Sequence, residues 1–277
     1  MTGSVRNRVL ARLFSSPAAL ASAAFLLLLI MLALFGSFLF RPEDLTISDY
    51  PLQPPSPDAR MGTDELGRNV LALIIEGAKA SLYVGFTAAF AATVIGILAG
   101  AIAGYYGGWV DLAIMRVTEV FQSLPNFVLA TLVVAMLGTG ESRVVLVIAA
   151  LAWPQTARLM RSEVLRVKGL DFVNAARCVG RTERWILLRE VVPNCLATVV
   201  ALGTLIVAEA ILLEASLSYF GLTDPDTISW GALLTSGQRF IYQAWWLSIF
   251  PGTAIFLTVL AFNMFGESLR HALDPKS

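Results

Sequence analysis

The sequence predicts an all-α membrane protein whose chain crosses the bilayer six times. Charged residues make up only 14% of its 277 residues, whereas soluble domains carry roughly 25%. The apolar residues, 57% of the total, fall in long uninterrupted blocks. Because a helix needs about 20 mostly apolar residues to cross a bilayer, blocks of this kind predict spanning helices.

Six blocks qualify as spans, and the first is predicted to be an anchor rather than a cleaved leader. It has no charge between Arg12 and Arg41 and ends in Phe-Leu-Phe-Arg, which offers no small-residue cleavage site. In the third block, Pro125 is expected to kink the helix or to mark its first turn. The predicted spans cover residues 17–40, 81–106, 121–137, 144–159, 196–217 and 245–265.

The distribution of lysine and arginine predicts that both termini are cytoplasmic. With the N-terminus inside, the cytoplasmic segments hold 14 of the 20 basic residues. Such an excess is typical of the loops that stay on the cytoplasmic side. The predicted cytoplasmic segments are 1–16, 107–120, 158–194 and 266–277.

Few residues of this chain are suited to catalysis or to metal binding. Its only cysteines are Cys178 and Cys195, and its only histidine is His271, so no metal-ligand pattern or disulfide framework arises. Both thiols are expected to be unpaired on the reducing side of the membrane. No Gly-x4-Gly-Lys-Ser/Thr phosphate loop occurs, so the chain is predicted to be no ATPase. A net charge of zero gives no global attraction for nucleic acid.

The second block carries a regular stripe of glycines. Gly96, Gly100 and Gly104 follow one another at four-residue spacing, with Gly85 upstream. Small residues at this spacing share one helical face and let a neighbouring helix approach closely. We expect a packing seam, although glycine is also simply common in membrane helices.

The cytoplasmic segment 158–194 is too polar to span the bilayer and is patterned like a helical hairpin. In its first half, Leu170, Val173 and Ala176 recur at helical spacing, and Asp171 suits the positive end of a helix dipole. Gly180 then occupies the position after the helix where a positive φ is easy for glycine. A first helix that ends at this glycine is therefore predicted.

The second half of this segment predicts another short helix. Thr182 is suited to cap its start, and Trp185, Leu188 and Val192 fall on one face. Pro193 is expected to end this helix before the next span. From periodicity alone, the segment could equally lie on anionic lipid headgroups.

The order of residues in this segment resembles the EAA loop of ABC importer permeases. Asn174-Ala175-Ala176 is followed four positions later by Gly180, and Val191-Val192-Pro193 closes the segment. Asn174 stands where the family usually has glutamate. The resemblance implies a coupling helix that docks on a separate ATP-hydrolysing subunit. The residues expected to carry this coupling are Asp171, Asn174, Ala175, Ala176, Gly180 and Pro193.

Other motifs resemble those of the dipeptide, oligopeptide and nickel permeases. Gly-Thr-Asp-Glu-Leu-Gly-Arg-Asn at 62–69 looks like the segment before their second span, although Asn69 is more often aspartate. The stretch 214–222, the triplet 229–231 and the tail 269–275 are also similar, but residues 223–226 replace a usual glycine and proline-rich stretch. Together these motifs cover the chain from about residue 60 to its end. The short outer segment after one anchor resembles the second permease of a heterodimeric pair.

The resemblance implies a type I ABC importer permease fold over residues 17–277, with the coupling loop at 158–194. Its expected partners are a second homologous permease, two ATPases that bind ATP and Mg²⁺, and an extracytoplasmic solute-binding protein. No cofactor is expected in this chain, which would lie in the inner membrane of a bacterium. Peptides are the first expected cargo, and nickel, glutathione or an opine are alternatives. An ion-driven secondary transporter or a membrane scaffold would not account for the loop motif, and we find no internal repeat of the kind many secondary transporters carry.

Glu209 and Glu214 lie in or near the fifth predicted span and have two interpretations. A carboxylate in hydrocarbon costs about 3 kcal/mol or more, so each should face protein or water. One interpretation is a translocation path, and the other is a hydrogen-bonded contact between helices. For Glu214, near the outer boundary, the structural interpretation is favoured, whereas for Glu209 both stay open. Residues 62–68 could bound an outer gate, but a cap on a short helix at 70–78 is favoured.

Overall fold

The computed structural model describes residues 16–38, 40 and 42–273, which form helices and loops without a β-strand. Five helices are long and apolar enough to cross a membrane, and a sixth candidate is a bent pair. The five are α2 (Pro17–Phe35), α3 (Val70–Tyr106), α6 (Glu141–Lys168), α9 (Val192–Tyr219) and α11 (Trp246–Leu273). Most of the predicted segment 1–16 lies outside the described residues, as do Leu39, Arg41, Asp274 and Pro275.

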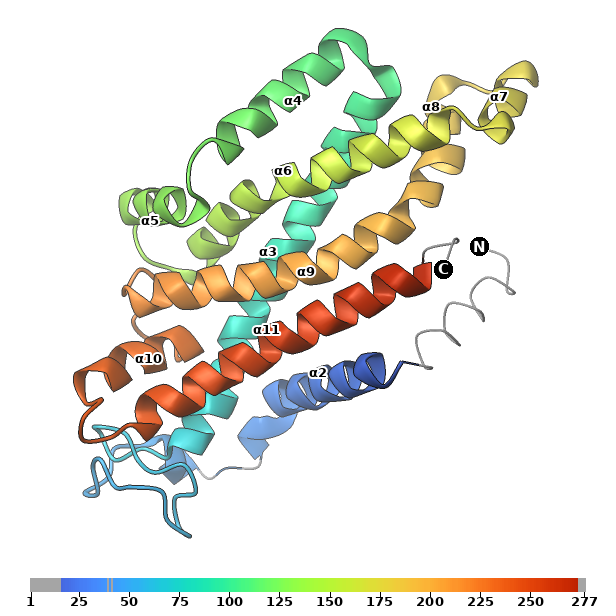
Figure 1. Cartoon of the computed structure of the whole chain (residues 1–277). Helices are drawn as coiled ribbons and strands as arrows, with labels where there is room; N and C mark the ends of the chain where they lie inside the picture. The colour runs from blue at the N-terminus through green and yellow to red at the C-terminus, as the bar shows by residue number, and fades with distance from the viewer. Residues whose placement is uncertain (1–15, 39, 41, 274–277) are drawn as a thin grey trace.

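The long helices form a bundle whose two ends differ (Figure 1). Helices α2, α11, α9 and α6 run side by side, and α3 crosses behind them. One end holds the loop 46–69, α10 (Trp230–Arg239) and the starts of α3 and α11. The other end holds the short helix α7 (Asp171–Cys178), and there α2 begins and α11 ends.

Helix α3 is a single helix where the sequence predicted a short helix followed by a span. Its 37 residues correspond to roughly 55 Å of length, which exceeds the roughly 30 Å of bilayer hydrocarbon. Asn69 caps its start, where its side-chain oxygen accepts a hydrogen bond from the Leu71 amide at 3.0 Å. Glu76 and Lys79 interrupt the apolar pattern of the sequence, but they pair with each other at 2.7 Å on the helix surface.

The third predicted span, 121–137, is not a continuous helix. Its residues fall on α4 (Gly108–Gln122) and α5 (Asn126–Leu137), which meet at an angle of 86°. Pro125 lies at the bend. Proline has no amide proton and disfavours helical backbone in the residue before it, so a helix cannot run straight through this point.

Pro193 does not end a helix, contrary to the prediction. Helix α8 (Glu183–Ile186) passes through a π-helical turn, η3 (Leu187–Val191), directly into α9. Pro193 is the second residue of α9 and directly follows the π-turn, where the regular pattern of helical hydrogen bonds is already interrupted. The wider turn also shifts the helical register. Leu188, predicted to be on the packed face, is consequently 65% exposed.

The buried face of this stretch consists of other residues than those predicted. Ile186, Leu187 and Val191 are buried there, and Trp185 and Val192 pack against them only in part. In the π-turn, the Val192 amide donates to the carbonyl of Leu187, one residue further back than in an α-helix.

The glycine stripe of α3 faces α6. A Cβ atom on Gly96 would lie 2.4 Å from the Thr156 Cβ, and one on Gly100 would lie 2.3 Å from the carbonyl oxygen of Ala157. At Gly104 the corresponding distance to the carbonyl oxygen of Arg161 is 2.8 Å. The two backbones are therefore close enough that only hydrogen fits between them.

We expect Gly100→Ala to destabilise the protein by about 1–3 kcal/mol, since the added methyl group overpacks the seam. It would meet both the Ala157 carbonyl and, at 2.8 Å, the Met160 Cβ. The thermal unfolding midpoint of the purified protein in detergent measures this effect. Gly252→Ala in α11 is the matched control, because its nearest new neighbour would be the Leu234 Cδ2 at 3.9 Å. Equal midpoints for the two variants would contradict the seam.

Candidate coupling and translocation sites

The loop between α6 and α9 forms a helical hairpin that turns at Gly180. This glycine has a φ of +80°, and its amide donates to the Arg177 carbonyl at 2.9 Å. The next amide, of Arg181, donates to the Ala176 carbonyl at 3.2 Å. These two bonds define a Schellman motif at the end of α7. Thr182 then caps α8 by accepting a hydrogen bond from the Trp185 amide.

Apolar contacts fix the inner side of the hairpin to the end of the bundle. Val173 is the buried residue of α7, and Ala176 lies half-buried beside the same cluster. The cluster combines residues of α3, α6, α8 and α9 with the hairpin. Its other members include Tyr105, Met160, Val164, Val167, Ile186, Leu187, Val191 and Cys195. The first helix of the hairpin therefore contacts an apolar cluster to which three of the long helices contribute.

A polar clasp, formed by Tyr105, Lys168, Arg177 and Glu183, adds to this apolar attachment. The Tyr105 hydroxyl donates to the Glu183 carboxylate, and the Lys168 ammonium donates to the backbone carbonyl of Tyr105. Arg177 on α7 lies 3.4 Å from the Glu183 carboxylate. Tyr105, through its side chain, and Glu183, through its charge, raise the pKa of the Arg177 guanidinium. The clasp thus ties the ends of α3 and α6 to both sides of the hairpin.

The outer side of α7 is exposed and partly apolar. Phe172 is 39% and Val179 78% exposed, although both are large apolar residues. Asp171, Asn174 and Ala175 share this exposed side. An exposed apolar patch beside charged residues is typical of a surface that another protein covers. We name residues 171, 172, 174, 175 and 179 the outer face of α7.

The six residues predicted to act in coupling therefore occupy different places. Asp171, Asn174 and Ala175 lie on the outer face of α7, and Gly180 forms the exposed turn beside it. Ala176 instead packs toward the bundle, and Pro193 is exposed on α9, outside the hairpin. The sequence did not indicate the clasp. Its only signal was the presence of a tyrosine and charged residues at the helix ends that flank the loop.

A groove of about 600 Å³, lined mostly by apolar side chains with a few polar ones, lies between the α4–α5 bend, α6 and α9. Glu209 lines it, together with the side chain of Gln155. Gln122 and Asn126, on the two sides of the bend, and Ser216 complete its polar lining. The sequence predicted a possible role for Glu209 but not for the other polar residues of the groove. In the sequence they stand only as isolated polar residues within apolar blocks.

Two contacts hold α4, and with it one wall of the groove, against α6. Arg161 donates two hydrogen bonds of 2.5 Å to the two carboxylate oxygens of Asp111. Further along, the rings of Phe121 and Trp153 meet edge to face with centroids 5.9 Å apart. A bidentate arginine–carboxylate pair is geometrically specific, so it also fixes the direction of α4.

Glu214 lies outside this groove and is 2% exposed. It lies between the Ser81 side of α3 and the Ser229 side of α10, and its Oε2 atom is buried without a hydrogen-bond partner among the described residues. Ser229 caps α10, and its hydroxyl lies 2.6 Å from that of Ser218 on α9. The burial of Glu214 between helices and outside the groove favours its structural interpretation, but the predicted hydrogen-bonded contact is not formed by Oε2.

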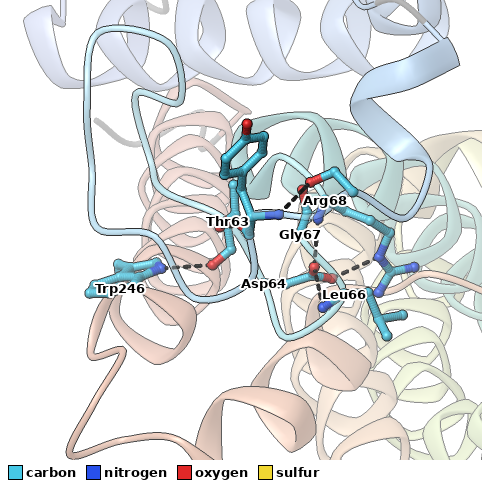
Figure 2. A network of polar contacts seen from close by, with 8 residues as sticks. Thr63, Asp64, Leu66, Gly67, Arg68 and Trp246 are labelled. Atoms are coloured by element: carbon cyan, nitrogen blue, oxygen red, sulfur yellow. Dashed lines mark hydrogen bonds and ion pairs between the residues drawn. The ribbon is translucent and has the colours of Figure 1, made fainter.

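At the other end of the bundle, residues 62–69 fold into a compact cap over the start of α3 (Figure 2). The Asp64 carboxylate accepts hydrogen bonds from the amides of Leu66 and Arg68 at 2.9 and 2.7 Å, and from the Arg68 side chain at 2.7 Å. The Trp246 indole donates to the Thr63 carbonyl at 3.1 Å, which joins the cap to α11. These contacts favour a capping role over a gate.

A bundle of spanning helices with a groove between them, a hydrogen-bonded cap at one end and an exposed hairpin at the other is typical of a membrane transport subunit. Residues 96–277 match the family of binding-protein-dependent transport system inner membrane components. Residues 4–55 match the N-terminal transmembrane domain of oligopeptide transport permease C. The chain belongs to the inner-membrane permeases of ABC importers, within the peptide and nickel group.

Curated relatives support this assignment along nearly the whole chain. The glutathione transport system permease protein GsiD of Pectobacterium atrosepticum is 38% identical over 261 residues, which cover 93% of this chain and 87% of that protein. The protein of the same name from Escherichia coli is 39% identical, covering 93% and 86%. Membership of this family excludes the ion-driven transporter and the scaffold as alternatives.

Solved structures support the fold. Inward-facing structures of the MetNI methionine ABC transporter contain a chain that matches this one with a TM-score of 0.61 at 18% identity. The match covers 74% of this chain and 98% of that chain. A second crystal form gives a TM-score of 0.60. The chain therefore has the type I ABC importer permease fold.

We expect Tyr105→Phe to loosen the hairpin while leaving the bundle folded. The variant loses a hydrogen bond to a charged carboxylate, which corresponds to about 1–2 kcal/mol. Amide hydrogen exchange in residues 171–186 should accelerate several-fold, as measured by mass spectrometry. Glu267→Gln breaks the exposed pair with Arg270 on α11 and should leave exchange in 171–186 unchanged. Unaltered exchange in Tyr105→Phe would show that the clasp does not hold the hairpin.

Proposed function

We propose that this chain forms half of the translocation path of an ATP-driven importer and that a second, homologous permease forms the other half. The outer face of α7 docks on one of two ATP-hydrolysing subunits, which bind ATP and Mg²⁺ themselves. An extracytoplasmic binding protein delivers the solute to the end of the bundle that carries the cap. The observation that carries this proposal is the α7 hairpin, exposed on one side and firmly attached on the other.

The attachment of the hairpin suits the transmission of force. Closure of the ATPases around ATP pulls the two coupling helices of the importer together, and the permeases open outward. Hydrolysis returns them to the inward-open state. Binding of ATP can drive this change only if it favours one state over the other. A hairpin held by Val173 and by the clasp transfers such a displacement to α3, α6 and α9 rather than bending locally.

The orientation follows from the same surface. Because the ATPases are cytoplasmic, the end of the bundle with α7 faces the cytoplasm. The start of α2 and the end of α11 lie at this end, which supports the proposal that both termini are cytoplasmic. The opposite end, with residues 62–69 and α10, faces the binding protein.

Short peptides are the proposed cargo, and glutathione is the first candidate. Relatives that match 93% of this chain are named for glutathione transport, and glutathione is itself a tripeptide. Nickel chelates and opines are the alternatives for the same machinery. Identification of the ligand that co-purifies with the cognate binding protein tests this choice.

We expect Ala175→Arg to abolish docking of the ATPase. Ala175 is exposed on the outer face of α7, so a long charged side chain would hold the partner away without disturbing the bundle. Uptake should fall at least tenfold, and the ATPases should no longer co-purify with the permeases. Ala175→Ser, a small change at the same position, should keep both. Normal uptake in Ala175→Arg would refute the coupling assignment.

We expect the two native cysteines to report the orientation without any substitution. Cys178 is exposed on α7, whereas Cys195 is buried in the bundle. A membrane-impermeant maleimide should label Cys178 in inside-out vesicles stripped of ATPase, but not in right-side-out vesicles. Cys195 should stay unlabelled in both preparations until the protein is denatured. Labelling of Cys178 from the outside would contradict the proposed topology, and rebinding of the ATPase should slow its labelling from the inside.

A further inference from the structure

The groove that contains Glu209 lies at a depth where hydrocarbon would surround the helices. Glu209 is an interior residue of α9, about 25 Å from the cytoplasmic start of this helix and about 15 Å from its outer end at 1.5 Å per residue. Its side chain is nonetheless exposed on the surface of this chain. A carboxylate at this depth is strongly disfavoured against lipid, so this face meets water or protein.

The break between α4 and α5 supports the same conclusion independently. Gln122 and Asn126 flank this break and line the groove opposite Glu209. Non-helical backbone at membrane depth is tolerated only where protein buries it or where it lines an aqueous cavity. Broken helices beside a polar cavity are also a recurrent feature of substrate sites in transporters.

The charge of the groove selects the kind of ligand. Among the described residues that line it, Glu209 is the charged one, and the others are amides, a serine and apolar side chains such as Phe127 and Leu213. The amide of Gln155, which also lines the groove, carries no charge that could neutralise the carboxylate. A volume of about 600 Å³ is within the range of roughly 300–1,000 Å³ typical of small-molecule sites.

We propose that this groove is a transient binding site for the substrate and that it recognises the cationic α-amino group of a short peptide. The Glu209 carboxylate accepts hydrogen bonds from the ammonium group. The amides of Gln122, Asn126 and Gln155 bond to the peptide groups, and the apolar wall accommodates the side chains. This site rests on the proposed function, since it requires that the cargo is a peptide that passes this face of the chain.

Transport of paired substrates by the complete importer in proteoliposomes tests the site. S-methylglutathione has a free α-amino group, and its N-acetyl derivative lacks the positive charge. Each is supplied at a concentration that saturates the binding protein, whose affinities are measured separately. Glu209→Gln should slow uptake of S-methylglutathione at least tenfold, because the charge-assisted bonds are lost, and should leave uptake of the N-acetyl derivative unchanged. Glu119→Gln, an exposed residue of α4 paired with Arg116, should change neither rate.

The outcomes separate the site from the function. If the unmodified importer transports neither compound, the proposed cargo is wrong, whatever Glu209 does. If Glu209→Gln slows both compounds equally, or neither, the ammonium site is overturned while the importer stands. An equal slowing would instead indicate that Glu209 pairs with the second permease.

A second measurement keeps the proposal falsifiable should Glu209→Gln fail to assemble. Ser216→Cys places a small thiol in the groove, in a chain whose own cysteines are replaced by Cys178→Ser and Cys195→Ala. A cationic methanethiosulfonate should modify this thiol about tenfold faster than an anionic one, since Glu209 concentrates cations in the groove. S-methylglutathione, which has no thiol to consume the reagent, should slow the reaction. Equal rates for the two reagents, or no protection by the peptide, would overturn the site.

Discussion

The close contact between the backbones of α3 and α6 is the constraint on which the rest of the structure depends. Three glycines on α3 bring the two helices together along the segment from Thr156 to Val164 of α6. Tyr105 directly follows the last of these glycines, and Lys168 ends α6. The seam therefore brings Tyr105 and Lys168 close together at one end of the bundle, where they form the clasp with the hairpin. A wider separation of α3 and α6 would leave the hairpin without its polar attachment.

The same pair of helices connects the two candidate sites. Gln155 of α6 lines the groove, and Lys168, roughly 20 Å further along the same helix at 1.5 Å per residue, belongs to the clasp. A packed pair of helices transmits displacement as one body because interiors at this density are not readily deformed. Movement of the hairpin would thus reach the groove through α6 without any flexible element between them.

Local signals made the hairpin predictable, whereas contacts between distant segments were not. Gly180 and Thr182 act within a few residues of themselves, and both have the predicted geometry. The bend at Pro125 was one of two outcomes that the sequence allowed, because hydropathy measures composition and not direction. The predicted helix end at Pro193 and the predicted burial of Leu188 were wrong, because the π-turn shifts the helical register. No residue type in the sequence signals such a turn. The clasp joins Tyr105 to Glu183, 78 positions later, and such a contact follows from the packing of the helices alone.

The cap at residues 62–69 has a consequence for recognition at its end of the bundle. Its carbonyl and amide groups are already bonded to one another, to Ser48 and to Trp246. Fixing the backbone of a residue costs roughly 1–2 kcal/mol of conformational entropy. In the cap, the backbone is already fixed before a partner binds. A protein that binds this surface meets a backbone that is already ordered. Its affinity therefore depends on shape complementarity rather than on folding induced by binding.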